Sequence, residues 1–163
     1  MIRFKQADSI KDCEVIEQLA RTIWREHYIP IIGKAQVDYM LAKFQSTLAI
    51  QEQIDTGFEY FWIEFESMPV GYMAYKLEKD SLFLSKIYVL ASYRGRKIGG
   101  AAMHFVEEQA KRYGLKTIML TVNKNNHKAT NAYLSLGFVN LGSVVAEIGN
   151  GFVMDDFKMA KTL

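Results

Sequence analysis

The hydrophobic pattern of this 163-residue chain changes its period near residue 59, and that change limits the possible folds more than any other feature of the sequence. Between residues 9 and 54 apolar residues recur at helical spacing. From Glu59 they form extended runs rich in aromatic and β-branched residues, which favour strands. Helical and extended segments then alternate toward the C-terminus. The pattern predicts an α/β chain with a mixed, mostly antiparallel sheet flanked by helices.

Breakers and capping residues set the expected boundaries of these segments. Asp8 or Ser9 can cap the first helix, and we expect Pro30 and Gly33 to break it. The expected order is β α α β β β α β α β β, with the three successive strands in the middle antiparallel. The segments are a strand at 2–7; helices at 9–27 and 35–44, followed by a further helical stretch at 48–54; strands at 59–65, 70–78 and 82–90; a helix at 98–113; a strand at 117–122; a helix at 126–136; and two strands within 138–160.

The composition is that of a globular protein of ordinary charge. Half of the residues are apolar and 23% are charged, and the length suits one core, so we expect a single domain over 1–163. The formal net charge of +2 creates no field that would attract nucleic acid. No segment reaches the roughly 20 apolar residues of a membrane helix, and the N-terminus lacks the apolar core of a signal peptide. We therefore expect a cytoplasmic protein with no nucleic-acid and no membrane partner.

Metal-ligating side chains are few. Cys13 is the single cysteine, so it cannot form an internal disulfide, and the three histidines are dispersed along the chain. A zinc site needs several such ligands at short spacings. We expect no metal.

A seven-residue segment, RGRKIGG, concentrates three cations and three glycines between an expected strand and an expected helix. At such a junction free backbone N–H groups and the helix dipole form an anion site, and glycines let a phosphate approach the backbone closely. The simpler alternative is a tight turn whose cations face water. Spacing excludes a P-loop and the Gly-x-Gly-x-x-Gly turn of dinucleotide-binding folds. The candidate phosphate-binding residues are Arg94, Gly95, Arg96, Lys97, Gly99 and Gly100.

Two segments together resemble the GCN5-related N-acetyltransferase (GNAT) superfamily: LSKIYVLASYRGRKIGGAAM and, further on, IMLTVNKNNHKATNAYLSLGF. The phosphate loop of that family reads Q/R-x-x-G-x-G/A. Arg94, Ile98 and Gly99 fit this loop, but Lys97 stands where the first glycine usually lies. The resemblance covers about residues 59 to 141. The second family pattern, N-x-x-A-x-x-x-Y-x-x-x-G-F, is matched in full by Asn126, Ala129, Tyr133, Gly137 and Phe138.

The resemblance implies a GNAT fold, whose fourth and fifth strands splay apart to admit the cofactor, and acetyl-CoA as the acetyl donor. It assigns acceptor-side helices to 1–58, an acetyl-CoA-binding core to 59–141 and C-terminal strands to 142–163. In such folds the strand before the loop pairs with the pantetheine arm, and the loop amides receive the pyrophosphate. The cofactor-binding residues so implied are Ile87, Tyr88, Val89, Arg94, Gly95, Arg96, Lys97, Ile98, Gly99, Gly100, Asn126 and Lys128.

Tyr133 is the predicted catalytic residue. It lies seven positions after Asn126, which is two helical turns, so both side chains are expected on one face. A phenol with a pKa of about 10 is suited to protonate the CoA thiolate that leaves when an amine attacks the thioester. The alternative is an aromatic ring that only packs the helix on the sheet.

The general base is left open by the sequence. Many members of the family place a glutamate on the strand before the loop, whereas this chain has Phe83 and Ser85 there and no acid between Ser81 and Val89. A water relayed by Ser85 could take the proton of the ammonium. The other candidate bases are Glu26, His27, Asp38, Asp155 and Asp156.

The acceptor is expected to be a small-molecule amine. IWREHYIPIIG and the closing MAKTL resemble the bacterial branch that includes PaiA-type polyamine acetyltransferases. Aromatic faces attract ammonium groups, although aromatics at helical spacing often form core instead. The alternatives are a non-catalytic acetyl-CoA-binding regulatory module and a peptide or protein N-acetyltransferase. A homodimer through the two last strands or through residues 59–65 stays open. The candidate acceptor-binding residues are Trp24, His27, Tyr28 and Ser85.

Overall fold

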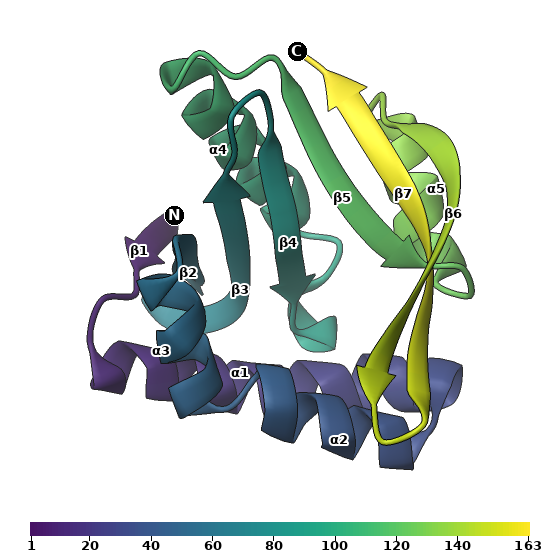
Figure 1. Cartoon of the computed structure of the whole chain (residues 1–163). Helices are drawn as coiled ribbons and strands as arrows, with labels where there is room; N and C mark the ends of the chain where they lie inside the picture. The colour runs from purple at the N-terminus through teal and green to yellow at the C-terminus, as the bar shows by residue number, and fades with distance from the viewer. The chain divides into compact units, whose positions relative to one another are not determined.

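A computed structural model describes all 163 residues of the chain, and its contacts divide them into two compact units (Figure 1). The first unit contains Met1–Leu77 and Leu84–Val106, and the second contains Glu78–Phe83 and Glu107–Leu163. In chain order the elements are β1 (Ile2–Gln6), α1 (Ile10–Ile32), α2 (Lys34–Phe44), α3 (Thr47–Asp55), β2 (Phe58–Phe65), β3 (Met68–Leu77), β4 (Leu82–Val89), the 3₁₀ helix η1 (Ala91–Tyr93), α4 (Ile98–Arg112), β5 (Thr117–Asn123), α5 (His127–Ser135), β6 (Val139–Gly149) and β7 (Phe152–Thr162).

The strands are hydrogen-bonded in the order β1-β2-β3-β4-β5-β7-β6, which confirms the mixed, mostly antiparallel sheet. The β1–β2, β2–β3, β5–β7 and β6–β7 pairs are antiparallel. The β4–β5 pair is parallel and joins Leu82 to Ile118 and Phe83 to Met119, at the N-terminal ends of both strands. The expected splay of β4 and β5 stays a prediction.

Helix α1 ends five residues later than the sequence predicted, because Pro30 does not end it. Ser9 caps the helix in a capping box with Asp12, and the helix stops only at Gly33, whose φ is 87°. Proline keeps a φ near that of a helix and lacks only its own N–H, so in the last turn it removes a single backbone hydrogen bond.

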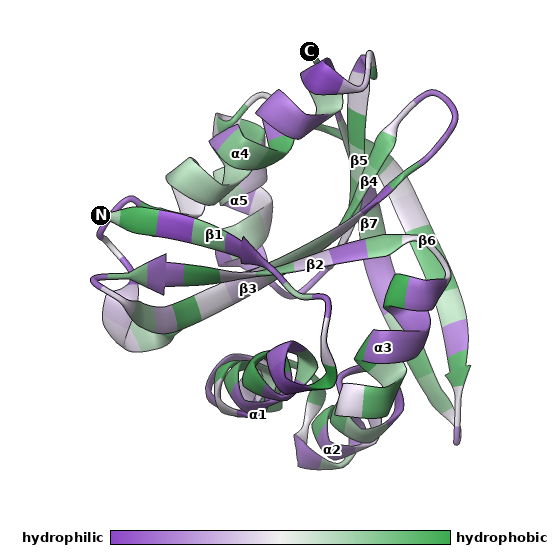
Figure 2. Cartoon of the chain, turned by 90° about the vertical axis from the view of Figure 1, so that its left-hand side faces the viewer, coloured by the Kyte–Doolittle hydropathy of each residue, from purple (hydrophilic) through white to green (hydrophobic).

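The expected helical stretch at 48–54 is a full helix, α3, so three helices separate β1 from β2 instead of the two in the expected order. Ser46 caps α3 by accepting a hydrogen bond from the N–H of Ala49. Figures 1 and 2 show α1, α2 and α3 grouped on one side of β1, β2 and β3. Hydrophobic and hydrophilic residues alternate around α1 in Figure 2, as expected for a helix with one buried face.

Successive residues of β2 face opposite layers of the first unit, as the pleat of a strand requires. Tyr60 donates a hydrogen bond to the side chain of Gln53 on α3. Phe61 packs edge-to-face on Phe105 of α4, with ring centroids 5.2 Å apart. The strands of this unit are therefore covered by α1–α3 on one face and by the part of α4 around Phe105 on the other.

Two tight turns set the hairpins. Asn150 and Gly151, between β6 and β7, both have positive φ, as do Glu66 and Ser67 between β2 and β3. Positive φ at both central residues of a two-residue loop defines the type I′ turn, whose twist matches that of antiparallel strands. Asn-Gly is the preferred sequence for this turn, and it fixes the register of the C-terminal hairpin.

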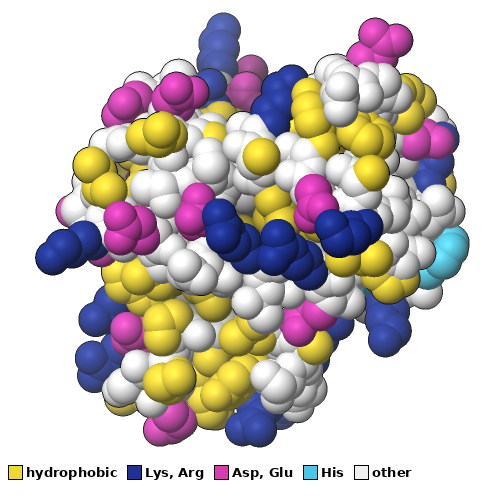
Figure 3. Space-filling model, turned by 90° about the horizontal axis from the view of Figure 1, so that it is seen from below, with side chains coloured by type: hydrophobic (Ala, Val, Ile, Leu, Met, Phe, Trp, Pro, Cys, Tyr) yellow, Lys and Arg dark blue, Asp and Glu magenta, His cyan; other side chains and the backbone are white.

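Strand β6 ends the sheet, and its side chains are largely exposed. Val139, Leu141 and Val145 are exposed apolar residues on this edge. Pairing of a second copy with β6 stays a prediction. The face of the molecule in Figure 3 carries basic and acidic side chains among hydrophobic ones, with a short row of basic side chains near its middle. None of the helices combines the length and the apolar composition that a membrane span requires.

Candidate functional site

The glycine-rich segment between β4 and α4 is held in place by hydrogen bonds on its N-terminal side. The N–H of Leu90 donates to the carbonyl of Val70 on β3 at 2.8 Å. The carboxylate of Glu26 on α1 accepts from the N–H of Ala91, the first residue of η1, also at 2.8 Å. These two bonds fix the backbone at the point where η1 and the glycine-rich loop begin. Glu26 therefore has a structural role.

The start of α4 has the chemistry of an anion site. The first N–H groups of a helix have no intrahelical acceptor, and here Ala101 is the residue whose N–H bonds back to the carbonyl of Lys97 at 3.1 Å. No acidic residue lies in the first turn. A Cβ added at Gly99 or Gly100 would meet no atom within 4 Å, so the space beside both Cα atoms is open. Exposed N–H groups, open space and the positive end of the helix dipole fit a phosphate.

Lys97, the departure from the family pattern, has the backbone conformation that a glycine would supply. Its φ is 64°, in the left-handed region, and Gly95 two residues earlier has a φ of 79°. Lys97 therefore differs from the family glycine in its side chain, but its backbone has the left-handed conformation that a glycine adopts easily.

Replacing Lys97 with Gly should stabilise the protein by about 1 kcal/mol, because a non-glycine residue at positive φ is strained by roughly that amount. The affinity for acetyl-CoA should change less than threefold if the backbone N–H groups, and not the Lys97 ammonium, provide most of the binding. Thermal unfolding and calorimetric titration measure both quantities. Lys97→Ala keeps the strain and is the matched control; a drop in stability for Lys97→Gly would contradict the assignment of strain.

The two arginines of the loop differ in their surroundings. Arg94 is exposed and follows η1 directly. The guanidinium of Arg96 stacks over two aromatic rings, 5.3 Å from the ring centre of Tyr93 and 5.6 Å from that of Phe65. These cation–π contacts orient the side chain of Arg96, whereas the backbone of the same residue belongs to the loop.

The backbone of β4 next to the loop approaches β3 closely. Ile87, Tyr88 and Val89, the predicted partners of a pantetheine arm, are partly exposed. A Cβ at Gly71 on β3 would lie 2.3 Å from the carbonyl oxygen of Tyr88 and 3.2 Å from the Cα of Val89. Only glycine fits at position 71, and this contact sets the position of the Tyr88 backbone.

The second family motif forms the two caps of α5, in the second unit. Asn126 is the N-cap and not the first helical residue: its side-chain oxygen accepts from the N–H of Ala129 at 3.4 Å. At the other end the N–H of Gly137 bonds to the carbonyl of Leu134, and the N–H of Phe138 bonds to the carbonyl of Tyr133. These two bonds, with a φ of 97° at Gly137, form a Schellman motif.

Tyr133, the predicted catalytic residue, has a packing role at the end of α5. Its ring contacts that of Phe138 at 5.5 Å between centroids, which is the hydrophobic contact that accompanies a Schellman motif. The side chain is only partly buried. Asn126, in contrast, is 4% exposed, and Lys128 is exposed. The predicted site residues therefore fall into two groups, one in each unit.

The structure brings the aromatic acceptor candidates together with the cofactor stretch of β4. The ring of Tyr88 lies 5.8 Å from Trp24 and 6.0 Å from Tyr28, and the hydroxyl of Tyr28 donates to that of Tyr88 at 3.4 Å. Trp24 is 5% exposed, and its indole N–H donates to Tyr72 at 2.8 Å. Trp24 thus packs from the core against the rings of Tyr28 and Tyr88. His27 is partly exposed, and its ring lies edge-on to that of Tyr28, with 4.8 Å between the ring centroids.

Lys86 is a residue that the sequence reasoning missed. Its ammonium donates to the hydroxyl of Ser85 at 3.1 Å and to the side-chain oxygen of Gln53 at 3.3 Å, and it lies over the ring of Tyr60 at 5.4 Å. No carboxylate pairs with it, and burial lowers the pKa of Lys86 to about 8. A lone lysine in the apolar run LFLSKIYVL was the signal that could have revealed it.

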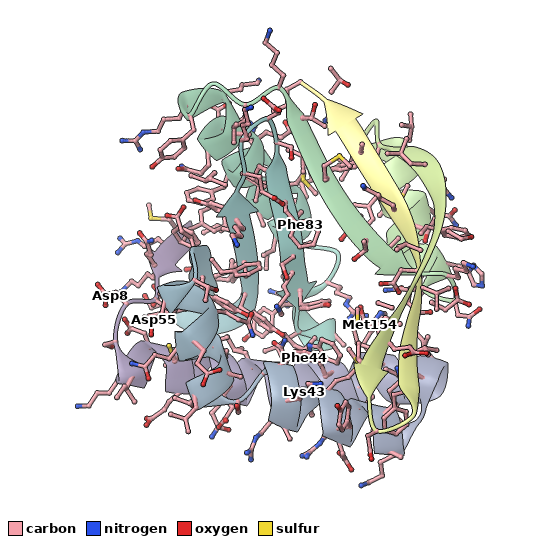
Figure 4. The ribbon with its side chains drawn as sticks, viewed as in Figure 1. Asp8, Lys43, Phe44, Asp55, Phe83 and Met154 are labelled. Carbon is pink, nitrogen blue, oxygen red and sulfur yellow. The ribbon has the colours of Figure 1, made fainter.

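A hollow of about 300 Å³ opens on the first unit near α2 and α3. Lys43 and Phe44, labelled on α2 in Figure 4, line it together with Gln53 of α3. None of the predicted site residues lines this hollow. Gln53 connects it to Lys86 through the hydrogen bond described above.

The acidic candidates for a general base differ in the groups to which their carboxylates are bound. Glu26 is bound to the backbone of Ala91. Asp38 accepts from Lys34 at 2.6 Å and lies 3.8 Å from Arg25, and the hydrogen bond from Lys34 holds the pKa of Asp38 below its usual value. Two acids remain near the last strand.

Of those two, Asp155 is exposed and forms a salt bridge with Lys124 at 2.8 Å. Asp156 is buried. No group of three or more His, Cys, Asp or Glu side chains is arranged to hold a metal ion.

Comparison with known proteins agrees with the resemblance seen in the sequence. Residues 16–138 match the model of the Acetyltransferase (GNAT) family. An uncharacterised N-acetyltransferase of Lactobacillus delbrueckii is 22% identical over 154 residues, covering 86% of this chain and 88% of that protein. Spermidine N(1)-acetyltransferase of Thermoplasma acidophilum is 23% identical over 152 residues, covering 90% and 92%.

Among solved structures, the PaiA N-acetyltransferase of Thermoplasma acidophilum in complex with coenzyme A superimposes with a TM-score of 0.83 at 21% identity, covering 100% of this chain and 99% of that one. At this identity the likeness shows the fold. This chain and the PaiA N-acetyltransferase therefore share the GNAT fold that the sequence predicted.

Proposed function

The chain belongs to the Acetyltransferase (GNAT) family, whose members take the acetyl group from acetyl-CoA, and on this premise we propose that it acetylates the primary amine of a small molecule such as a polyamine. The observation that carries the proposal is the start of α4, where a glycine-like loop leads into a helix with open, unpaired first-turn N–H groups. Acetyl-CoA supplies the acetyl group as an activated thioester. The tasks of the chain are to hold it, to orient the amine and to move protons.

The residues proposed to hold acetyl-CoA are those that the family resemblance implies. The backbone from Arg96 to Gly100 binds the pyrophosphate, and Arg94 and Lys128 add cationic side chains for phosphate oxygens. Main-chain groups of Ile87, Tyr88 and Val89 bind the pantetheine arm, as does Asn126. The contact at Gly71 supports this role for β4, because it fixes the backbone of Tyr88.

Tyr133 is proposed to protonate the departing sulfur of CoA. Its side chain is half-buried, and its place at the end of α5 is set by the Schellman motif and by the ring of Phe138. A neutral phenol with a pKa of about 10 can donate a proton to a thiolate at neutral pH.

The acceptor class rests on the likeness to a spermidine acetyltransferase and on the aromatic cluster around Tyr28 and Tyr88. Aromatic rings attract the ammonium groups of amines, which supports a cationic small molecule over a neutral one. His27 and Ser85 are the further residues proposed on the acceptor side.

The proposal is tested by incubating the protein with acetyl-CoA and one amine at a time, and measuring both the release of CoA thiol and the acetylated product. We expect spermidine or a related polyamine to give the highest kcat/KM, above aminoglycosides, amino acids and short peptides. A peptide as the best substrate would replace the small-molecule acceptor by a peptide or protein. Tight binding of acetyl-CoA without release of thiol on any amine would support the non-catalytic regulatory module instead.

A further inference from the structure

The glycine-rich loop between η1 and α4 has backbone hydrogen bonds only at its two ends. At the first end the N–H of Arg94 donates to the carbonyl of the first η1 residue at 3.2 Å, and at the other the carbonyl of Lys97 accepts from the N–H of Ala101 at 3.1 Å. The N–H groups of Gly95, Arg96 and Lys97 donate to no backbone carbonyl. A loop of this kind needs a side-chain contact to keep one conformation.

The side chain of Arg96 makes such a contact. Its guanidinium lies 5.3 Å from the ring centre of Tyr93 and 5.6 Å from that of Phe65. The centroids of these two rings are 6.1 Å apart, and the ring planes are tilted by 55°. One ring lies at the end of η1 and the other at the end of β2. The loop is therefore connected through Arg96 to a strand that is distant in the sequence.

Phe65 has a fixed place in the sheet. It is the last residue of β2 and pairs with Ile2 of β1 on one side and with Met68 of β3 on the other. Phe61, four residues earlier, lies on the same face of the strand and packs on Phe105 of α4. The ring of Phe65 thus belongs to the face of β2 on which α4 lies.

Tyr93 is attached to the sheet by a different route. Its N–H donates to the carbonyl of Leu90 at 2.9 Å, and the N–H of Leu90 donates to the carbonyl of Val70 on β3. The backbones that carry the two rings are therefore bonded to the sheet without the help of the loop. For this reason the rings can hold Arg96, and with it the loop.

We propose that Phe65 and Tyr93 are positioning residues for the acetyl donor: through the guanidinium of Arg96 they hold the loop in the form in which its backbone N–H groups bind the pyrophosphate. This inference rests on the proposed function and deepens it. A loop that is already held in its binding form loses less conformational entropy on binding, so its ligand binds more tightly. Both rings, Arg96 and the first turn of α4 lie in the first unit.

The alternative role for the guanidinium of Arg96 is a direct bond to a phosphate of CoA. The two roles differ in what happens when one ring is removed. If Arg96 holds the loop, the loss of the Phe65 ring loosens the loop and weakens binding, although every charge remains in place. If Arg96 binds the phosphate itself, the loss of the ring leaves the guanidinium and its partner intact, and binding stays as strong.

The test compares Phe65→Leu with Phe58→Leu, the same change at the other end of the same strand. Phe58 is half-buried like Phe65, and the ammonium of Lys76 lies 5.4 Å from its ring centre. For Phe65→Leu we expect the dissociation constant of acetyl-CoA to rise about two- to fivefold, the factor that one exposed cation–π contact contributes. For Phe58→Leu it should match that of wild type, although both variants lose a similar contact and should melt at similar temperatures. Titration calorimetry and thermal unfolding measure the two quantities.

Two further properties separate a positioning role from a general loss of stability. In steady-state kinetics Phe65→Leu should raise KM for acetyl-CoA and leave kcat and KM for the amine unchanged, because only the loop for the donor is loosened. The loss of affinity should be the same at low and at high salt, since the substitution removes no charge. Phe65→Tyr keeps an aromatic ring and should restore the affinity to within about twofold of wild type.

Arg96→Met provides a second test at an exposed position, where substitutions seldom affect folding. If the rings act through Arg96, the double variant Phe65→Leu/Arg96→Met should bind acetyl-CoA no more weakly than Arg96→Met alone, because the ring then has no cation to hold. In both single variants the amides of Gly95 and Lys97 should be more mobile than in wild type when no ligand is bound. Nitrogen-15 relaxation measures this mobility.

Two results would overturn the inference. One is an affinity of Phe65→Leu for acetyl-CoA equal to that of Phe58→Leu, and the other is a pair of single-variant losses that multiply in the double variant. In both cases a wild-type protein that binds acetyl-CoA and acetylates amines would leave the proposed function standing. If the wild type binds no acetyl-CoA, the proposed function fails, and this inference fails with it.

Discussion

Tyr133→Phe is expected to lower kcat by roughly 100- to 10,000-fold, the range in which general acids contribute. The substitution removes one hydroxyl and keeps the ring, so the contact with Phe138 and both backbone bonds of the Schellman motif should survive. The dissociation constant of acetyl-CoA and the melting temperature should therefore stay close to those of wild type. Steady-state kinetics, calorimetric titration and thermal unfolding measure these three quantities.

Tyr113→Phe is the matched control for this change. Tyr113 follows α4, is 54% exposed and has no proposed role, so the loss of its hydroxyl should leave kcat unaltered. A Tyr133→Phe variant with kcat within twofold of wild type would remove Tyr133 from the chemistry and leave it the role of a helix-capping ring.

The double variant Arg94→Ala/Arg96→Ala should weaken the binding of acetyl-CoA by about 10- to 100-fold, because a hydrogen bond to a charged group contributes roughly 1.5–3 kcal/mol. We expect most of the loss to come from Arg94, since the guanidinium of Arg96 is already stacked on Tyr93 and Phe65. The loss should shrink as salt is added, because salt screens exposed charges. Titration calorimetry at two ionic strengths measures it.

Lys111→Ala/Arg112→Ala is the control for this pair, since it removes the same number of cations from the last turn of α4, at the end that lies away from the loop. Its affinity for acetyl-CoA should match that of wild type. If the two double variants bind acetyl-CoA equally well, binding depends on the overall charge of the protein. That result would contradict the proposal that the loop binds the phosphates of CoA.

The sequence predicted the order of elements well, because each helix and strand has its own hydrophobic period. The errors arose where local signals compete. Pro30 is a helix breaker in general, but in the last turn of α1 it removes one hydrogen bond only, and the helix continues to Gly33. Lys97 departs from the glycine of the family loop, yet its φ of 64° shows that the backbone kept the glycine conformation. Backbone dihedral angles of this kind cannot be read from residue type.

The parts of the candidate site that depend on one short segment could be predicted from the sequence. The parts that depend on contacts between distant segments could not. The spacing from Asn126 to Phe138 reflects one helix with its two caps, so it is visible in the sequence. The environment of Asp156 depends on Thr121, which is far away along the chain and adjacent only through the pairing of β5 with β7. Burial likewise lowers the pKa of Lys86, whose neighbours Tyr60 and Gln53 lie on another strand and on a helix. The sequence therefore names candidate proton acceptors, whereas the partner of each acid is visible only in the folded structure.

The most direct test of the account is the release of CoA thiol from acetyl-CoA by the wild-type protein, with and without spermidine. Acetyl transfer predicts thiol release that requires both the protein and the amine, with one acetylated amine formed for each thiol. Thiol release that is equal with and without amine would indicate hydrolysis instead of transfer. No release with spermidine or any other primary amine would contradict the account.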